Sequence, residues 1–179
     1  MISGRLVQLR EKRLSDARED YAWQTDPELA ELDAALPLDM PFAHYRDLYS
    51  GELWHRSRSR QRYAVDTMDG THIGNCGYYN IDDEKCEAEL GIMIGDRNYW
   101  NKGYGKDIIS TLLSDIFQST QFERIYLKTL ESNLRAQQCF QKCGFRSYGQ
   151  ASEGRYHFRL MEITKPEWEA LQADVSPSP

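Results

Sequence analysis

The chain has 179 residues, 40% of them hydrophobic, and its 22 Lys and Arg against 28 Asp and Glu give a formal net charge of -6. This length fits one domain, whose core is large enough to fold without disulfides or a structural metal. A negative chain repels phosphate backbones and attracts cations. We therefore exclude nucleic acid as a general partner and expect a cationic one.

Targeting signals are absent from the N-terminal residues, which lack the apolar core of a secretory signal, and the apolar runs are too short to cross a membrane. We therefore expect a cytoplasmic protein with no membrane partner. A single domain is predicted over residues 1–172, with a disordered tail over residues 173–179. The sequence leaves a homodimer open.

The cysteines show no paired CxxC spacing, so in a reducing compartment we expect buried thiols and no disulfide: Cys76, Cys86, Cys139 and Cys143. The histidines show no ligand spacing, which predicts no metal site: His44, His55, His72 and His157.

The elements expected in the first half follow from hydrophobic periodicity and turn signals. They are a strand at 6–9, a helix at 17–25 ended by Asp26-Pro27, a helical region at 41–55, and strands at 63–65, 73–79 and 86–94. Asp69-Gly70 is a hairpin signal between two of these strands. In the strand at 86–94, alternation puts Glu87 and Glu89 on one face and apolar residues on the other.

The second half begins with a clear amphipathic helix, because apolar residues recur at helical spacing over 103–119. It continues with a strand at 124–130, a helix capped by Asn133 that runs through Lys142 to Gly144, a strand from Phe145, a strand at 155–163 and a short helix at 166–171.

The segment before the long helix, Tyr99-Trp100-Asn101-Lys102-Gly103-Tyr104-Gly105-Lys106, has the composition of an anion-binding loop. Glycines allow a close approach of the main chain, and unpaired N–H groups at a helix start favour a pyrophosphate. An ordinary glycine-containing loop is the alternative. The third glycine of a dinucleotide fingerprint is missing, and no phosphate-binding GxxxxGK[ST] motif occurs.

Four stretches in order, Glu89-Leu-Gly-Ile-Met-Ile-Gly, Trp100-Asn-Lys-Gly-Tyr-Gly, Asn133-Leu-Arg-Ala and Lys142-Cys-Gly-Phe145, resemble the GNAT superfamily of acetyl-coenzyme A dependent N-acetyltransferases. The residues of these motifs are most similar to those of the Rim-type branch, which acetylates N-terminal amines of ribosomal proteins. The resemblance implies an α/β (α+β) fold. Its sheet would be mixed, mostly antiparallel and splayed, with six to seven strands and about four flanking helices. The co-substrate, acetyl-CoA, would enter between the strands at 86–94 and 124–130.

The resemblance also implies which residues bind the coenzyme. The backbone at Met93, Ile94 and Gly95 would hold the pantetheine and polarise the thioester carbonyl. The amides of one loop would hold the pyrophosphate: Asn101, Lys102, Gly103, Tyr104, Gly105 and Lys106. Asn133 would bond the pantetheine, act as a plain helix cap, or do both.

Two positions depart from the family pattern. Trp100 stands where Gln or Arg is common, and Phe140 stands where many members place the Tyr that protonates the departing thiolate. Phe140 would therefore line the coenzyme site, and the general acid stays unassigned. Cys139 and Cys143 lie one turn apart nearby, and we interpret them as small core residues, with a nucleophile or a disulfide pair as the alternatives.

An amine must lose a proton before it attacks a thioester, so a base is expected. The candidate is Glu89, with Glu87 on the same strand face as the second choice. The alternative is that these carboxylates pair with a basic side chain or merely attract the amine.

The acceptor is the least defined part of the prediction. Eight acids and one Arg lie between Asp16 and Asp39, either as a solvated face or as a surface that steers a cation. We expect direct transfer of acetyl from acetyl-CoA to a primary amine in a ternary complex, with a protein N-terminus favoured. The alternatives are a polyamine or aminoglycoside acetyltransferase and a non-catalytic coenzyme A-binding sensor.

Overall fold

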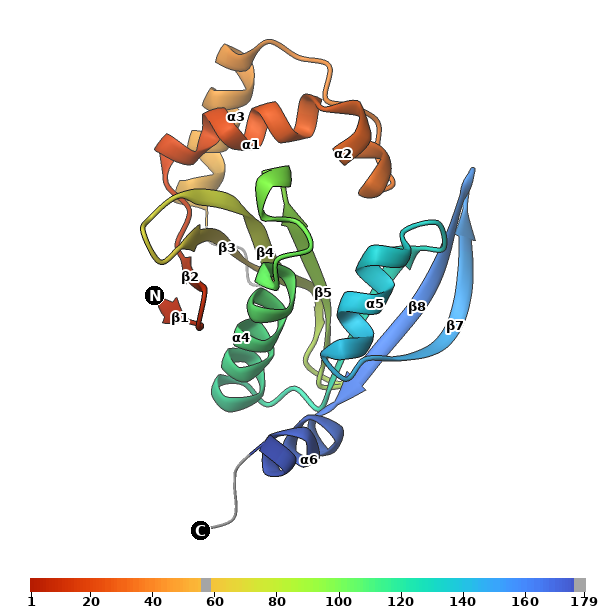
Figure 1. Ribbon diagram of the computed structural model, residues 1–179. Helices are drawn as coiled ribbons and strands as arrows, with labels where there is room; N and C mark the ends of the chain where they lie inside the picture. Colours follow the sequence, from red (N-terminus) through yellow and green to blue (C-terminus); the bar gives the residue numbers. More distant parts are fainter. Residues whose placement is uncertain (56–58, 176–179) are drawn as a thin grey trace.

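The centre of the molecule is one sheet of eight strands in the order β1-β2-β3-β4-β5-β6-β8-β7 (Figure 1). The computed structural model describes residues 1–55 and 59–175. The strands are β1 (Ile2–Ser3), β2 (Val7–Arg10), β3 (Arg60–Thr67), β4 (His72–Asp82), β5 (Glu87–Ile94), β6 (Arg124–Leu130), β7 (Arg146–Glu153) and β8 (Tyr156–Thr164). All neighbours are antiparallel except β5 and β6. The mixed, splayed sheet is confirmed, with one more strand than the upper expectation.

Six α-helices occur in the described residues, where about four were expected. They are α1 (Ala17–Thr25), α2 (Pro27–Leu32), α3 (Phe42–Trp54), α4 (Tyr104–Ser119), α5 (Leu134–Lys142) and α6 (Lys165–Val175). Asp26-Pro27 ends α1 as predicted, but it also begins α2, because the Asp26 carboxylate accepts the N–H groups of Glu28 and Leu29. None of these helices combines the length and the apolar character needed to span a bilayer.

The C-terminal boundary differs from the prediction. Helix α6 continues to Val175, so the chain is still helical after residue 172, where the domain was expected to end. The remaining part of the predicted tail, residues 176–179, lies outside the described residues.

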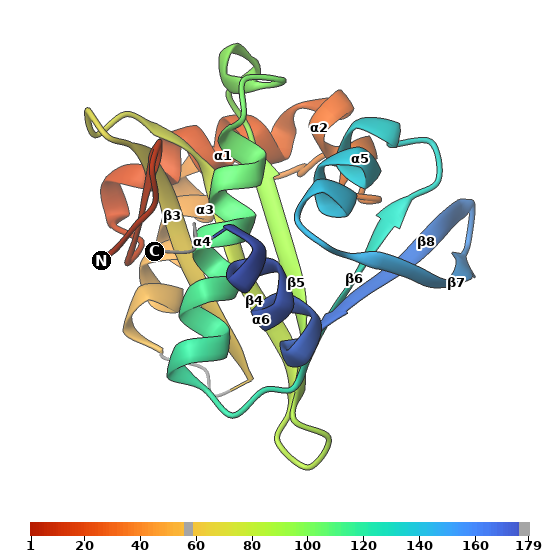
Figure 2. The same ribbon diagram turned by 60° about the horizontal axis from the view of Figure 1, so that its bottom comes forward.

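Helix α4 lies on one face of the sheet, and α1 and α3 lie behind it on the other face (Figure 2). The predicted apolar stripe of α4 is buried throughout: Ile108, Ile109, Leu112, Leu113, Ile116 and Phe117. It packs on the apolar face of β5, where Ala88 and Leu90 are buried, as the alternation predicted. The other face of β5 therefore carries Glu87 and Glu89 toward the side of α1 and α3.

The sheet splits between its two parallel strands. β5 and β6 pair only at Glu87–Arg124, Ala88–Ile125 and Glu89–Tyr126. Beyond Glu89 the strands diverge, and α5 lies beside the opening (Figure 1). On the side away from β4, this gap leaves the backbone of β5 beyond Glu89 without a neighbouring strand, and it positions the site described next.

Candidate active site

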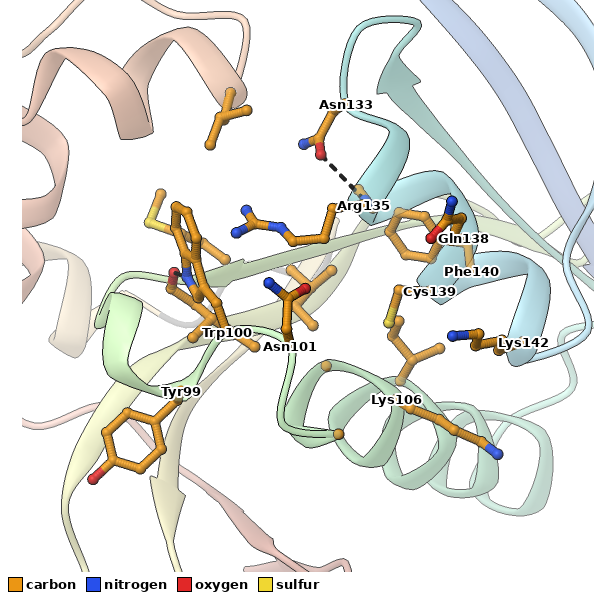
Figure 3. Close-up of a pocket in the computed structure, with 18 of the residues that line it drawn as sticks. Tyr99, Trp100, Asn101, Lys106, Asn133, Arg135, Gln138, Cys139, Phe140 and Lys142 are labelled. Atoms are coloured by element: carbon orange, nitrogen blue, oxygen red, sulfur yellow. Dashed lines mark hydrogen bonds between the residues drawn. The ribbon is translucent and has the colours of Figure 1, made fainter.

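A cavity of about 450 Å³ opens where β5 leaves β6 (Figure 3). Its walls are the end of β5, the loop before α4, the first turns of α4, and helix α5. Most of the predicted coenzyme residues line it: Met93, Ile94, Asn101, Gly103, Gly105, Lys106, Asn133 and Phe140. Three of the predicted coenzyme residues do not line it, and neither do the two candidate catalytic residues: Gly95, Lys102, Tyr104, Glu87 and Glu89. The sequence did not indicate the α2 wall, which is made by Leu29, Leu32 and Asp33.

The backbone of β5 forms one side of the cavity. The Gly95 N–H donates to the Ile73 carbonyl at 2.9 Å, so Gly95 does not supply a free donor for a thioester. Because the bonding direction alternates along an antiparallel ladder, Ile92 and Ile94 direct their N–H groups into the gap. Gly95 serves packing instead, since a Cβ added there would lie 2.0 Å from the Trp23 ring.

The loop before α4 has the backbone of an anion cradle. Asn101 and Gly103 have φ of 57° and 89°, in the left-handed region that suits glycine and asparagine. The first backbone bond of the helix runs from the Asp107 N–H to the Gly103 carbonyl, so the N–H groups before Asp107 have no helical acceptor. These donors and the positive end of a 16-residue helix fit a pyrophosphate.

The acid in the first turn of α4 faces away from this cradle. The Asp107 carboxylate accepts the backbone N–H groups of Arg5, Leu6 and Val7, at 2.7 to 3.2 Å. It therefore holds the turn between β1 and β2 against α4. Tyr104 packs edge-on against Tyr99, with ring centres 5.0 Å apart.

Trp100 makes two contacts that join separate walls of the cavity. Its Nε1 donates to the Ile94 carbonyl at 2.7 Å, which ties the cradle to the end of β5. The Arg135 guanidinium lies over its ring, 3.4 Å from the ring centre. Arg135 thereby reaches across the cavity from α5 (Figure 3). The sequence placed Arg135 in the Asn133-Leu-Arg-Ala motif but did not predict its contact with Trp100.

Asn133 caps α5 as predicted. Its Oδ1 accepts the Ala136 N–H at 3.1 Å, and the side chain also lines the cavity (Figure 3). The cap and the predicted pantetheine contact therefore remain compatible. Phe140 offers no proton, and its ring packs against Phe145 with centres 5.7 Å apart.

The two candidate carboxylates have different surroundings. Glu89 is buried and accepts hydrogen bonds from the Asn80 amide at 2.8 Å and the Tyr79 hydroxyl at 3.3 Å. Burial, and next the negative charge of Glu89, raise the pKa of Tyr79. Glu87 instead forms an ion pair with Arg124 at 2.5 Å, which is the structural alternative that the sequence left open.

Most of the acids between residues 16 and 39 are used within the fold. Ion pairs join Asp16 to Arg10, Asp20 to Lys12 and to His72, Asp26 and Glu28 to Arg97, and Glu31 to Arg155. Asp33 differs, because this residue lines the rim of the cavity, is partly open to solvent, and has no basic side chain paired with it in residues 1–55 and 59–175. The surrounding protein desolvates Asp33 and raises its pKa.

Sequence comparison places the site in a family. The profile of the acetyltransferase (GNAT) domain matches residues 6–146. An uncharacterized N-acetyltransferase, p20 of Bacillus licheniformis, is 27% identical over 165 residues, which cover 86% of this chain and 92% of that protein. The spermine/spermidine N(1)-acetyltransferase of Bacillus subtilis (strain 168) is 29% identical over 88 residues, 49% of this chain and 58% of that protein.

Solved structures share the fold. A spermidine N-acetyltransferase from Vibrio cholerae, in complex with CoA and spermine, has a TM-score of 0.80 and 20% identity, and covers 92% of this chain and 98% of that one. The aminoglycoside acetyltransferase AAC(6')-Ib with coenzyme A has a TM-score of 0.76 and 21% identity, with 93% and 99% covered. These relatives do not point to the ribosomal-protein branch that the sequence favoured. The chain belongs to the GNAT family of acetyltransferases.

Proposed function

We propose that the protein transfers acetyl from acetyl-CoA directly to a primary amine of a polycationic small molecule, of the polyamine or aminoglycoside class. The observation that carries this proposal is Asp33, an acid that lines the coenzyme cavity and has no basic partner in the described residues. Similarity to acetyltransferases named for spermidine, spermine and aminoglycosides supports it. A protein N-terminus, which the sequence favoured, becomes the competing acceptor.

The residues around the cavity fit the coenzyme. When bound, acetyl-CoA supplies an activated acetyl thioester. The free N–H groups at the start of α4 would hold its pyrophosphate, and Asn133 its pantetheine arm. The Ile94 N–H, which faces the gap, would donate to the oxygen that becomes negative when the amine attacks.

Glu89 is the proposed base. Its two hydrogen-bond donors, Tyr79 and Asn80, are uncharged and fix the carboxylate on the face of β5 opposite α4. A carboxylate held in this way can take a proton from an ammonium, directly or through water, and free the lone pair for attack. Glu87 is proposed to act only through its ion pair with Arg124.

An acceptor screen tests the proposal. Spermidine, spermine, an aminoglycoside and N-terminal peptides are each incubated with acetyl-CoA, and acetylated products are identified by mass spectrometry. We expect turnover of the polycations at lower KM than the peptides. Exclusive turnover of peptides would overturn the acceptor class, and coenzyme binding without any product would favour the sensor that Phe140 allows.

Two variants, a test and its control, examine where the acceptor binds. Asp33→Asn removes the unpartnered charge, and we expect it to raise KM for polycations about tenfold, the effect of roughly 1.4 kcal/mol. Asp39→Asn is the matched control, because it removes an acid from the same segment outside the cavity lining. Equal KM values for the two variants would contradict the role of Asp33.

A further inference from the structure

Cys139 places a thiol inside the coenzyme cavity. It lines the cavity from α5, and its sulfur is directed toward the start of α4 (Figure 3). A methyl group built on Gly105 would lie 3.1 Å from the Cys139 Sγ. The sulfur therefore lies against the cradle, and any group added to it would occupy space that a bound pyrophosphate needs.

The surroundings of this sulfur favour its thiolate. The neighbouring Cys143 thiol is the first cause that lowers the pKa of Cys139; burial opposes it, and three cations add to it: Lys142, Arg135 and Lys106. The start of α4 contributes its positive end. Cys143 keeps its proton, because the neighbouring Cys139 sulfur and burial raise its pKa, and its thiol donates to the Lys106 carbonyl at 3.8 Å.

The other thiols lack this combination. Cys76 is buried in the core, and burial raises its pKa. Cys86 is partly exposed but lies on the acidic turn between β4 and β5, where its sulfur is 3.6 Å from the Asp83 carbonyl oxygen. Among the four cysteines, only Cys139 is reached from the cavity and also has positively charged side chains beside it.

We propose that Cys139 is a modification site for anionic low-molecular-weight disulfides, and that the mixed disulfide closes the coenzyme cradle. The Cys139 thiolate attacks one sulfur of the disulfide, a new S–S bond forms, the old one breaks, and the second sulfur leaves as a thiolate with the electron pair. A thiol reductant reverses the exchange. The cations around the sulfur attract an anionic disulfide and stabilise the leaving thiolate.

The test uses two disulfides of opposite charge on the intact protein: dithiobis-nitrobenzoate, an anion, and cystamine, a cation. Peptide mapping by mass spectrometry identifies the modified cysteine. We expect the anion to modify Cys139 about tenfold faster than Cys86 at neutral pH, the cation to show no such preference, and acetyl-CoA to protect Cys139. Isothermal titration should show acetyl-CoA binding lost after modification and restored by dithiothreitol.

Variants provide matched controls. Cys86→Ser should leave the rate of modification at Cys139 unchanged. Cys139→Ser should bind acetyl-CoA with the same affinity before and after incubation with the disulfide. If that variant is unstable, the mapping of the wild-type protein decides alone. Faster modification of Cys86, equal rates for the two disulfides, or a lack of protection by acetyl-CoA would each overturn the proposal.

Discussion

Trp100 connects three parts of the active site through one side chain. Its indole N–H reaches the last carbonyl of β5, and its ring supports Arg135. Arg97 lies on the same ring at 5.5 Å and pairs with acids at the junction of α1 and α2. The coenzyme cradle is thereby linked to β5, to α5 and to the junction of α1 and α2.

Replacing Trp100 by Phe keeps an aromatic ring for Arg135 but removes the N–H donor to Ile94. We expect acetyl-CoA affinity to fall about threefold to tenfold, the effect of one net hydrogen bond. Isothermal titration measures it, with the exposed Trp54→Phe as the control that should not change. Trp100→Leu, which also removes the ring, should lose more acetyl-CoA affinity. An affinity equal to that of Trp100→Phe would show that stacking of Arg135 on the ring does not contribute.

Glu89→Gln tests the base. At neutral pH we expect kcat/KM to fall by roughly 10² to 10⁴, with coenzyme affinity almost unchanged, and the loss should shrink as pH approaches the pKa of the amine. Steady-state rates across pH measure this. Glu87→Gln is the comparison, because it removes a carboxylate from the same strand face; an equal loss in both variants, or a wild-type pH profile in Glu89→Gln, would contradict the assignment.

At the scale of elements, a buried ionic cluster fastens α1 to the sheet. The Asp20 side chain is fully buried and contacts Lys12 at 2.6 Å, Asn75 at 2.7 Å and His72 at 3.2 Å, while the Tyr49 hydroxyl of α3 donates to it. Since α1 also places Trp23 on Gly95, this cluster sets the distance between α1 and the end of β5.

The cluster makes stability depend on pH through His72. Burial alone would lower its pKa, but the hydrogen bond and charge of Asp20 raise it above the ordinary value. A raised pKa in the folded state means that the stabilisation is full below about pH 6.5 and is lost as pH rises through the folded value. Thermal unfolding should therefore show a Tm that falls from pH 6 to pH 8, and His72→Gln should flatten that slope; an unchanged slope would exclude His72 as its source.

The sequence predicted best those helices and strands whose ends carry a signal within a few residues, such as a capping residue or a glycine. The cap at Asn133, the terminator at Gly144 and the apolar stripe of α4 are short-range signals, and the structure begins and ends those helices there. Strand β1 and helix α2 were not predicted, because β1 has two residues and exists only through pairing with β2, and α2 begins at a proline that was interpreted as a stop.

The sequence could predict those parts of the site that are formed by one continuous segment of the chain. The cradle is such a segment, and most of its residues line the cavity as expected. Asp33 is brought there by the packing of α2 across the split, which no spacing in the sequence encodes. The sequence placed Arg135 in a motif and Cys139 near the site, but it did not show what either side chain contacts. The backbone at Met93, Ile94 and Gly95 was expected to hold the pantetheine and thioester, and the sequence could not show that the Gly95 N–H is already engaged by the Ile73 carbonyl.

At the scale of the whole molecule, the net charge of -6 is not a measure of the field at the active site. Internal ion pairs neutralise most of the acids between residues 16 and 39, and Arg135 and Lys106 bring positive charge to the coenzyme side. Negative charge facing the cavity is concentrated at Asp33. Attraction of a cationic acceptor should therefore be local and modest.

The salt dependence of turnover tests this distribution. Screening over about 8 to 10 Å weakens the attraction between Asp33 and a polycation, so kcat/KM for spermidine should fall as salt is raised. The Asp33→Asn variant should show a flatter dependence, and a peptide with neutral residues after its N-terminus should show little change. A slope that survives in Asp33→Asn would place the attraction elsewhere on the surface.

The short pairing of β5 with β6 gives the sheet two leaves that are joined at one end. Three residue pairs connect them, and the amides of Ile92 and Ile94 face the opening. A ligand that bridges the opening completes the missing ladder, so the two leaves should become one mechanical unit only in the complex. Amide hydrogen exchange should accordingly slow at Ile92 and Ile94 when acetyl-CoA binds, while Met93, already paired with Asn75 of β4, should exchange slowly in both states.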